Sequence, residues 1–217
     1  SSDYQRLARE WRFDKTNATG AVTLRVDAAQ LPALPSGFTT YYAIVDQDGD
    51  FTTTGNQDVL PLSPASGTVY EATGVTAIDD GDRVTIAIGS PAAVPQNVTA
   101  QSDLNERIVA TWDEVTTNAA GLSTTLMSPQ YTVYIDSRDD GGFAFGDATA
   151  LASGTDYTLS TSSGTVTAEI TNDQGDDNGA GTTELENGTD YRLWITATNA
   201  VGESALSSPV TATPALK

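Results

Sequence analysis

The stretch from Leu185 to Ser204 decides the fold, and it reads Leu-Glu-Asn-Gly-Thr-Asp-Tyr-Arg-Leu-Trp-Ile-Thr-Ala-Thr-Asn-Ala-Val-Gly-Glu-Ser. In its apolar run, Leu193 and Ile195 point to one side of the chain and Trp194 to the other. Alternation with a period of two is typical of a β-strand, and glycines mark turns. The stretch therefore predicts a strand that is flanked by turns at Gly188 and Gly202.

The same period of two recurs through the rest of the 217 residues. Val22, Leu24 and Val26 alternate with polar neighbours, whereas the run 38–45 is apolar on both faces, as in a central strand. Many short strands separated by turn signals predict an all-β chain made of tandem sandwiches. The proline-bearing stretch 90–95 is the expected linker between a domain of residues 1–89 and a domain of residues 96–217.

From Pro95 to Pro214 the residues resemble the fibronectin type III family. Trp112 matches the tryptophan of its second strand, Tyr131 lies in the third strand, and Leu185 to Ser204 look like its E-F corner, F strand and F-G turn. The resemblance implies a β-sandwich with Trp112, Tyr131 and Tyr191 in the core. It also implies that the Tyr191 hydroxyl bonds back to the upstream backbone.

The first half resembles, more loosely, an Ig-like module of large bacterial surface and adhesin-type proteins. The residues that carry this likeness are Leu7-Ala-Arg9-Glu-Trp11, Gly20-Ala-Val22-Thr-Leu24 and Asp46-Gln-Asp48-Gly49-Asp50-Phe51. The resemblance implies an extracellular or cell-surface location in a bacterium. The polar segment 1–9 is expected to be either an arm that pairs with another subunit or a disordered end.

Charge and composition exclude several classes of function. The chain has 29 acidic residues against 10 basic ones, a net charge of −19, no cysteine and no histidine. Thiolate or imidazole zinc sites and histidine-dependent catalytic triads are therefore excluded. The negative charge argues against nucleic acid and anionic lipid as partners, and no apolar run is long enough to insert into a membrane. The acidic excess fits either a saline habitat or an ordinary acidic secreted protein.

Acidic clusters are the candidate metal sites, and calcium is the expected ion because it takes oxygen ligands in flexible geometry. The first cluster follows a hydrophobic strand, and three close carboxylates repel one another unless a cation lies between them. The alternative is solvated Asp-Gly turns whose carboxylates cap backbone N–H groups. The candidate ligands are Asp46, Asp48, Asp50, Asp79, Asp80 and Asp82, with a second candidate site at Asp173, Asp176, Asp177 and Asn178.

Trp194 is the candidate partner contact because it is expected on the outer face of its strand. Trp11 is expected in the core.

The leading hypothesis is a non-catalytic exported structural protein: a stalk, an adhesin segment or a calcium-stiffened filament subunit. Its expected partners are copies of itself, as in a homopolymer, or other surface proteins. The alternative is an accessory carbohydrate-binding or spacer module of a secreted multidomain enzyme, with polysaccharide as the partner. Catalysis by the chain itself would need two carboxylates across a cleft, and the glycine-rich context of the acidic clusters argues against it.

Overall fold

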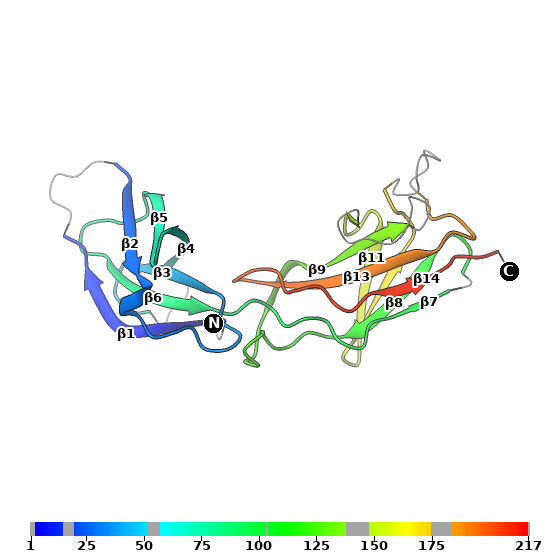
Figure 1. Ribbon diagram of the computed structural model, residues 1–217, viewed down its shortest axis with the longest axis horizontal. Coiled ribbons are helices and arrows are strands. Elements are labelled where there is room, and N and C mark those ends of the chain that lie inside the picture. Colours follow the sequence, from blue (N-terminus) through cyan, green and yellow to red (C-terminus); the bar gives the residue numbers. More distant parts are fainter. Residues whose placement is uncertain are drawn as a thin grey trace. The chain divides into compact units, whose positions relative to one another are not determined.

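The computed structural model describes residues 3–14, 20–51, 57–102, 104–137, 148–174 and 184–216. The chain divides into two compact units, Ser1–Ser90 (unit 1) and Pro91–Lys217 (unit 2), whose strands are labelled in Figure 1. Within the described residues there are fourteen strands and one short 3₁₀ helix, and no helix is long and apolar enough to cross a membrane. The all-β class predicted from the sequence is confirmed.

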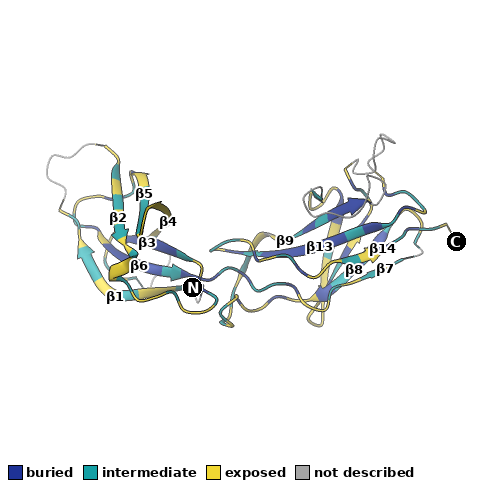
Figure 2. Cartoon of the chain, in the orientation of Figure 1, coloured by how far each residue is buried: buried dark blue, intermediate teal, exposed yellow. Residues whose placement is uncertain are grey.

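Unit 1 is one antiparallel six-stranded sheet in the order β1-β6-β3-β4-β5-β2. The strand β4 joins the two parts of this sheet, since its first half pairs with β3 and its second half pairs with β5. Central β3, which pairs with β4 and β6, is buried along almost its whole length, as Figure 2 shows. The bounds are β1 (Tyr4–Arg12), β2 (Val22–Asp27), β3 (Thr40–Asp46), β4 (Gln57–Ser66), β5 (Val69–Val75) and β6 (Arg83–Gly89), with the 3₁₀ helix η1 at Ala28–Gln30.

The segment expected to be a free arm is a strand of unit 1 itself. Tyr4 of β1 lies opposite Gly89 of β6, and its ring packs edge-on against Tyr42 at 5.0 Å between centroids. A bulge between Arg6 and Glu10 shifts the register, and the Thr85 hydroxyl lies within hydrogen-bond distance of two carbonyl oxygens of this bulge. The arm and disorder expectations are thus both wrong for the described part of the segment. The reason is pairing with a strand about eighty residues later in the sequence.

Unit 2 is a sandwich of two four-stranded sheets, β11-β12-β8-β7 and β10-β9-β13-β14. The apolar faces of β8 and β13 meet in one core, where the rings of Trp112 and Tyr131 contact each other edge to face at 5.3 Å. Ala92, inside the expected linker, is buried in this core. The bounds are β7 (Thr99–Gln101), β8 (Ile108–Asp113), β9 (Leu126–Ser137), β10 (Thr149–Ala150), β11 (Tyr157–Ser162), β12 (Thr165–Ile170), β13 (Tyr191–Asn199) and β14 (Val210–Ala212).

Candidate functional site

Tyr191 closes the corner at the start of β13. Its side chain is fully buried, its hydroxyl oxygen accepts the Glu186 backbone N–H at 2.9 Å, and its O–H donates to Asp173 Oδ2 at 3.1 Å. Burial raises the pKa of Tyr191 above its ordinary value of 10.0, and the Asp173 carboxylate raises it further. The hydroxyl therefore stays protonated at neutral pH and can keep donating to the carboxylate.

Only one of the four candidate ligands of the second calcium site lies among the described residues. Asp173 is fully buried and accepts the Tyr191 hydroxyl, whereas Asp176, Asp177 and Asn178 lie outside the described residues. In the described part of the chain, Asp173 thus holds the corner together.

A buried carboxylate that the sequence reasoning missed is Asp156. Its Oδ2 accepts the Ala152 N–H at 2.7 Å and the Gln174 side-chain amide. A signal for it exists in the tetrapeptide Gly-Thr-Asp-Tyr, which occurs at 154–157 and again at 188–191. In both copies the glycine has positive φ and the tyrosine begins a strand, so the repeat marks the same kind of turn twice.

The acidic turns of unit 1 use carboxylate oxygens to cap backbone N–H groups. Asp46 Oδ1 accepts from the N–H of Asp48 at 3.1 Å and from that of Gly49, and Asp48 Oδ1 accepts from Asp50 at 2.8 Å. Gly49 has φ +79°, and a Cβ there would lie 2.5 Å from Arg83 Cδ. These are the hydrogen bonds of Asp-Gly turns.

The neighbouring cluster follows the same pattern, since Asp82 Oδ2 accepts the Asp79 N–H at 2.7 Å and Asp80 lies in the turn between them. Within the described ranges, no group of three or more acidic side chains is placed to hold a metal. Asp46 Oδ2 is buried and has no hydrogen-bond partner. Calcium at this loop stays a prediction.

Trp194 is not an exposed contact residue. Only 7% of it is accessible, which corrects the exposure expected from its outward position. Its register partner in the sheet is Tyr134 of β9, so a second large aromatic side chain stands beside it on the same face. The residues implied to be core, Trp112, Tyr131 and Tyr191, are all almost fully buried.

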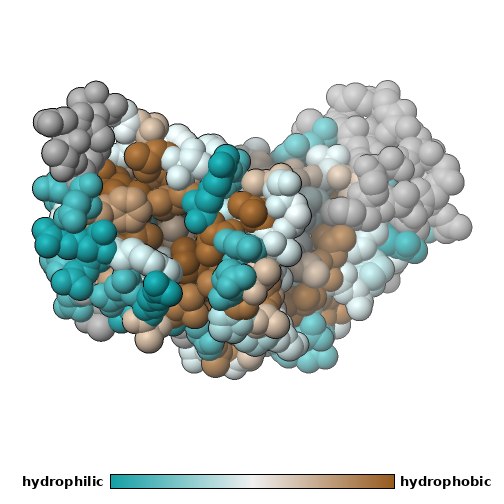
Figure 3. Space-filling model, turned by 60° about the vertical axis from the view of Figure 1, so that its left-hand side comes forward, coloured by the Kyte–Doolittle hydropathy of each residue, from teal (hydrophilic) through white to brown (hydrophobic). Residues whose placement is uncertain are grey.

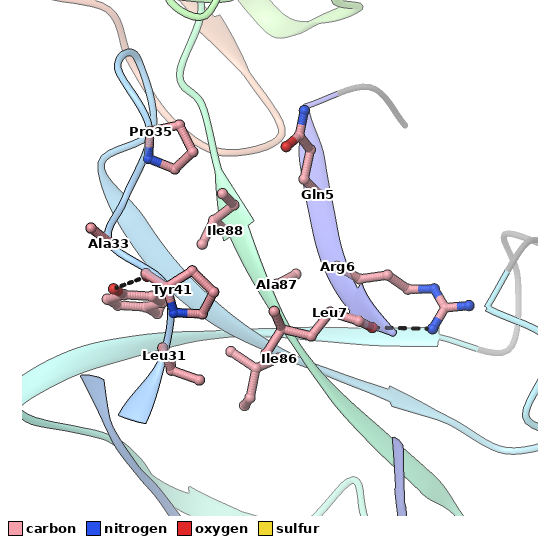
Figure 4. Close-up of a pocket in the computed structure, with 11 residues that line it drawn as sticks. Gln5, Arg6, Leu7, Leu31, Ala33, Pro35, Tyr41, Ile86, Ala87 and Ile88 are labelled. Carbon is pink, nitrogen blue, oxygen red and sulfur yellow. Dashed lines mark hydrogen bonds between the residues drawn. The ribbon is translucent and has the colours of Figure 1, made fainter. Parts of the chain in front are cut away.

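Unit 1 has an apolar groove between its edge strands β1 and β2. A cavity of about 370 Å³ lies between these strands. A neighbouring cavity of about 220 Å³, shown in Figure 4, is lined by β1, β6 and residues 31–35, and Ile86 lines both cavities. Figure 3 shows hydrophobic side chains gathered on the forward face of unit 1 and bordered by hydrophilic ones. Trp11, which was expected in the core, lines the larger cavity and is only partly buried. We call this the β1–β2 groove; its main apolar lining residues are Leu7, Trp11, Leu24, Val26, Leu31 and Ile86.

Arginines border this groove although the chain is strongly acidic. Three of the ten basic residues, Arg6, Arg9 and Arg12, lie in β1, and Arg25 of β2 lines the larger cavity together with Arg12. The Arg9 guanidinium lies 5.2 Å from the centre of the Trp11 ring, within cation–π range. Arg25 pairs with Glu71 at 2.7 Å, whereas Arg9 has no ion pair within the described residues. Arg6 pairs with Glu10 at 3.1 Å and Arg12 pairs with Asp14 at 3.6 Å. The groove thus combines an apolar floor with a border on which arginines alternate with carboxylates.

Comparison with known proteins gives a family for part of the chain. The family described as "Domain of unknown function (DUF8202)" matches residues 1–82, which is less than half of the chain. No curated protein matches the chain.

Similar solved structures include fibronectin type III domains. The chicken CNTN1 FN1-FN3 domains have a TM-score of 0.39 and 13% identity over 83% of this chain, and Astrotactin-2 has a TM-score of 0.40 and 16% identity over 59%. A human fourth FNIII domain has a TM-score of 0.35 and 17% identity, with coverage of 58% of this chain and 84% of that domain. The chain spans 57% of the CNTN1 structure and 23% of the Astrotactin-2 structure.

Proposed function

We propose that the chain is a non-catalytic structural segment of an exported bacterial protein. It serves as part of a cell-surface stalk or adhesin, or as a subunit of an extracellular filament. Its partners are copies of itself or other surface proteins.

The observation that carries this proposal is that buried polar side chains in unit 2 form hydrogen bonds that hold turns against strands. In unit 2 the carboxylates of Asp156 and Asp173 and the hydroxyl of Tyr191 bind backbone or side-chain donors and acceptors that fix turns to strands. The Tyr191–Asp173 bond joins β13 of one sheet to the segment after β12 of the other, and breaking it on separation of the sheets would leave a buried carboxylate with one bond fewer. Mechanical cohesion of this kind suits a connecting or supporting segment.

The alternative role as a carbohydrate-binding or spacer module has less support. Stacking on sugar rings needs accessible aromatic faces. Trp194, the contact residue expected from the sequence, is 7% exposed and cannot supply one, so this alternative loses the residue on which it was based.

The proposal includes calcium, which binds the loop that follows β3 and stiffens it. Its support is the second oxygen of Asp46, which is buried and lacks a hydrogen-bond partner. A cation bound only to the native state raises the melting temperature by mass action.

Calorimetry with calcium and then with chelator should show this rise, and Asp48→Ala should remove it. The control Asp58→Ala changes an exposed carboxylate outside both clusters, and identical melting in calcium and chelator would contradict the calcium site.

Location and assembly are tested in the cells that make the protein. Antibodies against the purified chain should label intact cells or shed filaments, and external protease should remove that signal. Labelling confined to the interior of lysed cells would overturn the proposal. Light scattering of the purified chain then separates a self-assembling subunit, which forms polymers, from a segment that works inside a longer protein and stays monomeric.

A further inference from the structure

Asn187 and Gly188 form a chemically reactive pair at the corner before β13. The sequence contains two Asn-Gly pairs, at 178–179 and 187–188, and only the second lies among the described residues. In such a pair the peptide nitrogen of glycine attacks the side-chain amide of asparagine with little hindrance, because glycine has no Cβ. The corner therefore contains a site of spontaneous chemical modification.

The reaction is a deamidation that consumes only water. The Gly188 nitrogen gives its proton to a solvent base and bonds to Asn187 Cγ, the bond from Cγ to Nδ2 breaks, and Nδ2 takes a proton from solvent and leaves as ammonia. Water then opens the five-membered imide at one of its two carbonyl carbons. The product at position 187 is an aspartyl residue, or an isoaspartyl residue in which the main chain runs through Cγ. Both products are negatively charged at neutral pH.

The structure holds both reacting groups in hydrogen bonds. The Gly188 N–H donates to the Pro214 carbonyl at 2.8 Å. The Asn187 amide accepts the Glu106 N–H through Oδ1 and donates through Nδ2 to Asn105 Oδ1, both at 3.1 Å. Attack requires the glycine nitrogen to lose the proton that it donates, and the asparagine amide to turn away from its partners. The folded corner therefore slows the reaction.

The Pro214 carbonyl belongs to residues 213–215, which follow β14 and which we call the strap. The strap is bonded to the corner and to the turn after β7 through single hydrogen bonds. Besides the bond to Gly188, these run from Thr213 N–H to Ser102 Oγ at 3.1 Å, from Thr213 Oγ1 to Asp190 Oδ1 at 2.6 Å, and from Ala215 N–H to Leu104 O at 3.1 Å. Segments held by a few isolated bonds open locally at a lower free energy than core strands do. Opening of the strap would free the Gly188 N–H while the sandwich stays folded.

Deamidation changes the charge and the hydrogen bonds of the corner. A cavity of about 410 Å³ is lined by Asn187 together with three glutamates, Glu106, Glu184 and Glu186. A carboxylate at position 187 would add a fourth negative charge to this lining, and like charges repel. The new carboxylate would also lack the amide hydrogens that now donate to Asn105. The modification thus acts on the corner that Tyr191 closes.

We propose that Asn187 is a deamidation site that the strap protects, and that local opening of the strap exposes it to reaction. Because the reaction releases ammonia, each opening that leads to it leaves a permanent charge at position 187. This inference goes beyond the proposed function, since it rests on unit 2 alone and does not depend on where the protein is located.

The test measures deamidation of the full chain by peptide mapping and mass spectrometry at mildly alkaline pH. In concentrated urea the chain is unfolded, so Asn178 and Asn187 should react at similar rates and give the unprotected reference. In native buffer we expect Asn187 to react at least about tenfold more slowly than in urea, because only locally opened molecules react. The Gly188 amide should show matching protection from hydrogen exchange.

Variants separate the strap from the rest of unit 2. Thr213→Val removes the hydroxyl bond to Asp190, and Ser102→Ala removes the acceptor of the Thr213 N–H. Each should speed native deamidation of Asn187 about fivefold, as expected for the loss of one hydrogen bond. The matched control Thr211→Val, on an exposed residue of β14, should leave the rate unchanged.

Two results would overturn the proposal. One is native deamidation of Asn187 at the rate measured in urea, which would mean that the corner gives no protection. The other is a native rate that both strap variants leave unchanged, or raise only as far as they speed hydrogen exchange of the amides of β13. In that case the site would open by unfolding of the whole sandwich, and the strap would have no role of its own.

Discussion

The two units use similar alternating strands but bury them to different degrees. In unit 2 the inward residues Leu193 and Ile195 of β13 are fully buried. In unit 1 the inward residues Leu24 and Val26 of β2 are only partly buried, although their alternation is as regular. The difference teaches that a period of two tells which side chains point inward, but not whether a second layer covers them.

The cause lies in how each sheet closes. Unit 2 covers its core with two four-stranded sheets, whereas unit 1 has a single sheet that folds over through β4 and leaves the β1–β2 groove open. Since apolar stabilisation follows the area removed from water, the same residue type contributes less in unit 1. Unit 1 is therefore expected to be the less stable unit.

Truncating one tryptophan in each unit tests this difference most directly. Trp112→Ala should lower the free energy of unfolding of unit 2 by about 3–5 kcal/mol, because it opens a cavity in a closed core. Trp11→Ala should cost unit 1 less, about 1–3 kcal/mol, because Trp11 is only partly buried and lines a cavity that is already open. Hydrogen exchange read by mass spectrometry resolves the two units in the intact chain. Equal costs in the two units would show that the groove is covered in solution.

The corner tyrosine offers a second contrast of smaller size. Tyr191→Phe removes the hydrogen bond from the Glu186 N–H and the hydrogen bond to the buried Asp173 carboxylate, so it should destabilise unit 2 by about 2–3 kcal/mol. Tyr41→Phe in unit 1 removes only a long hydrogen bond to Pro32, at 3.5 Å, and should cost less than about 0.5 kcal/mol. Urea unfolding of both variants checks this, and a costly Tyr41→Phe would mean that unit 1 depends on polar contacts as much as unit 2.

The sequence predicted local features of the fold better than distant ones. The all-β class follows from alternation and turn residues, which act over a few positions. Trp112, Tyr131 and Tyr191 lie in the core where the family resemblance placed them. The role of Tyr4–Arg12 was missed because that strand pairs with Arg83–Gly89, and no local pattern records a partner so far away in the sequence.

The candidate sites were predicted less well for the same reason. Carboxylate spacing at Asp46, Asp48 and Asp50 is compatible with both a cation site and a capped turn, and the hydrogen bonds follow the turn pattern. The outward position of Trp194 was inferred correctly from alternation, but its burial depends on what lies beside it. The β1–β2 groove depends on which strands end up at the two edges of a sheet, which is a property of topology.

The smallest expected effect concerns Asp27, an exposed carboxylate at the end of β2 beside the open edge. The Thr68 hydroxyl donates to it at 2.6 Å and the Ala29 N–H at 3.0 Å, and these bonds lower its pKa below the ordinary 3.8. Because the folded-state pKa is the lower one, the contribution to stability is present above pH 3.8 and is lost as pH falls through the folded-state value. NMR titration of the Asp27 carboxyl should show this, and Thr68→Val should move the pKa back toward 3.8, since it removes the larger of the two causes.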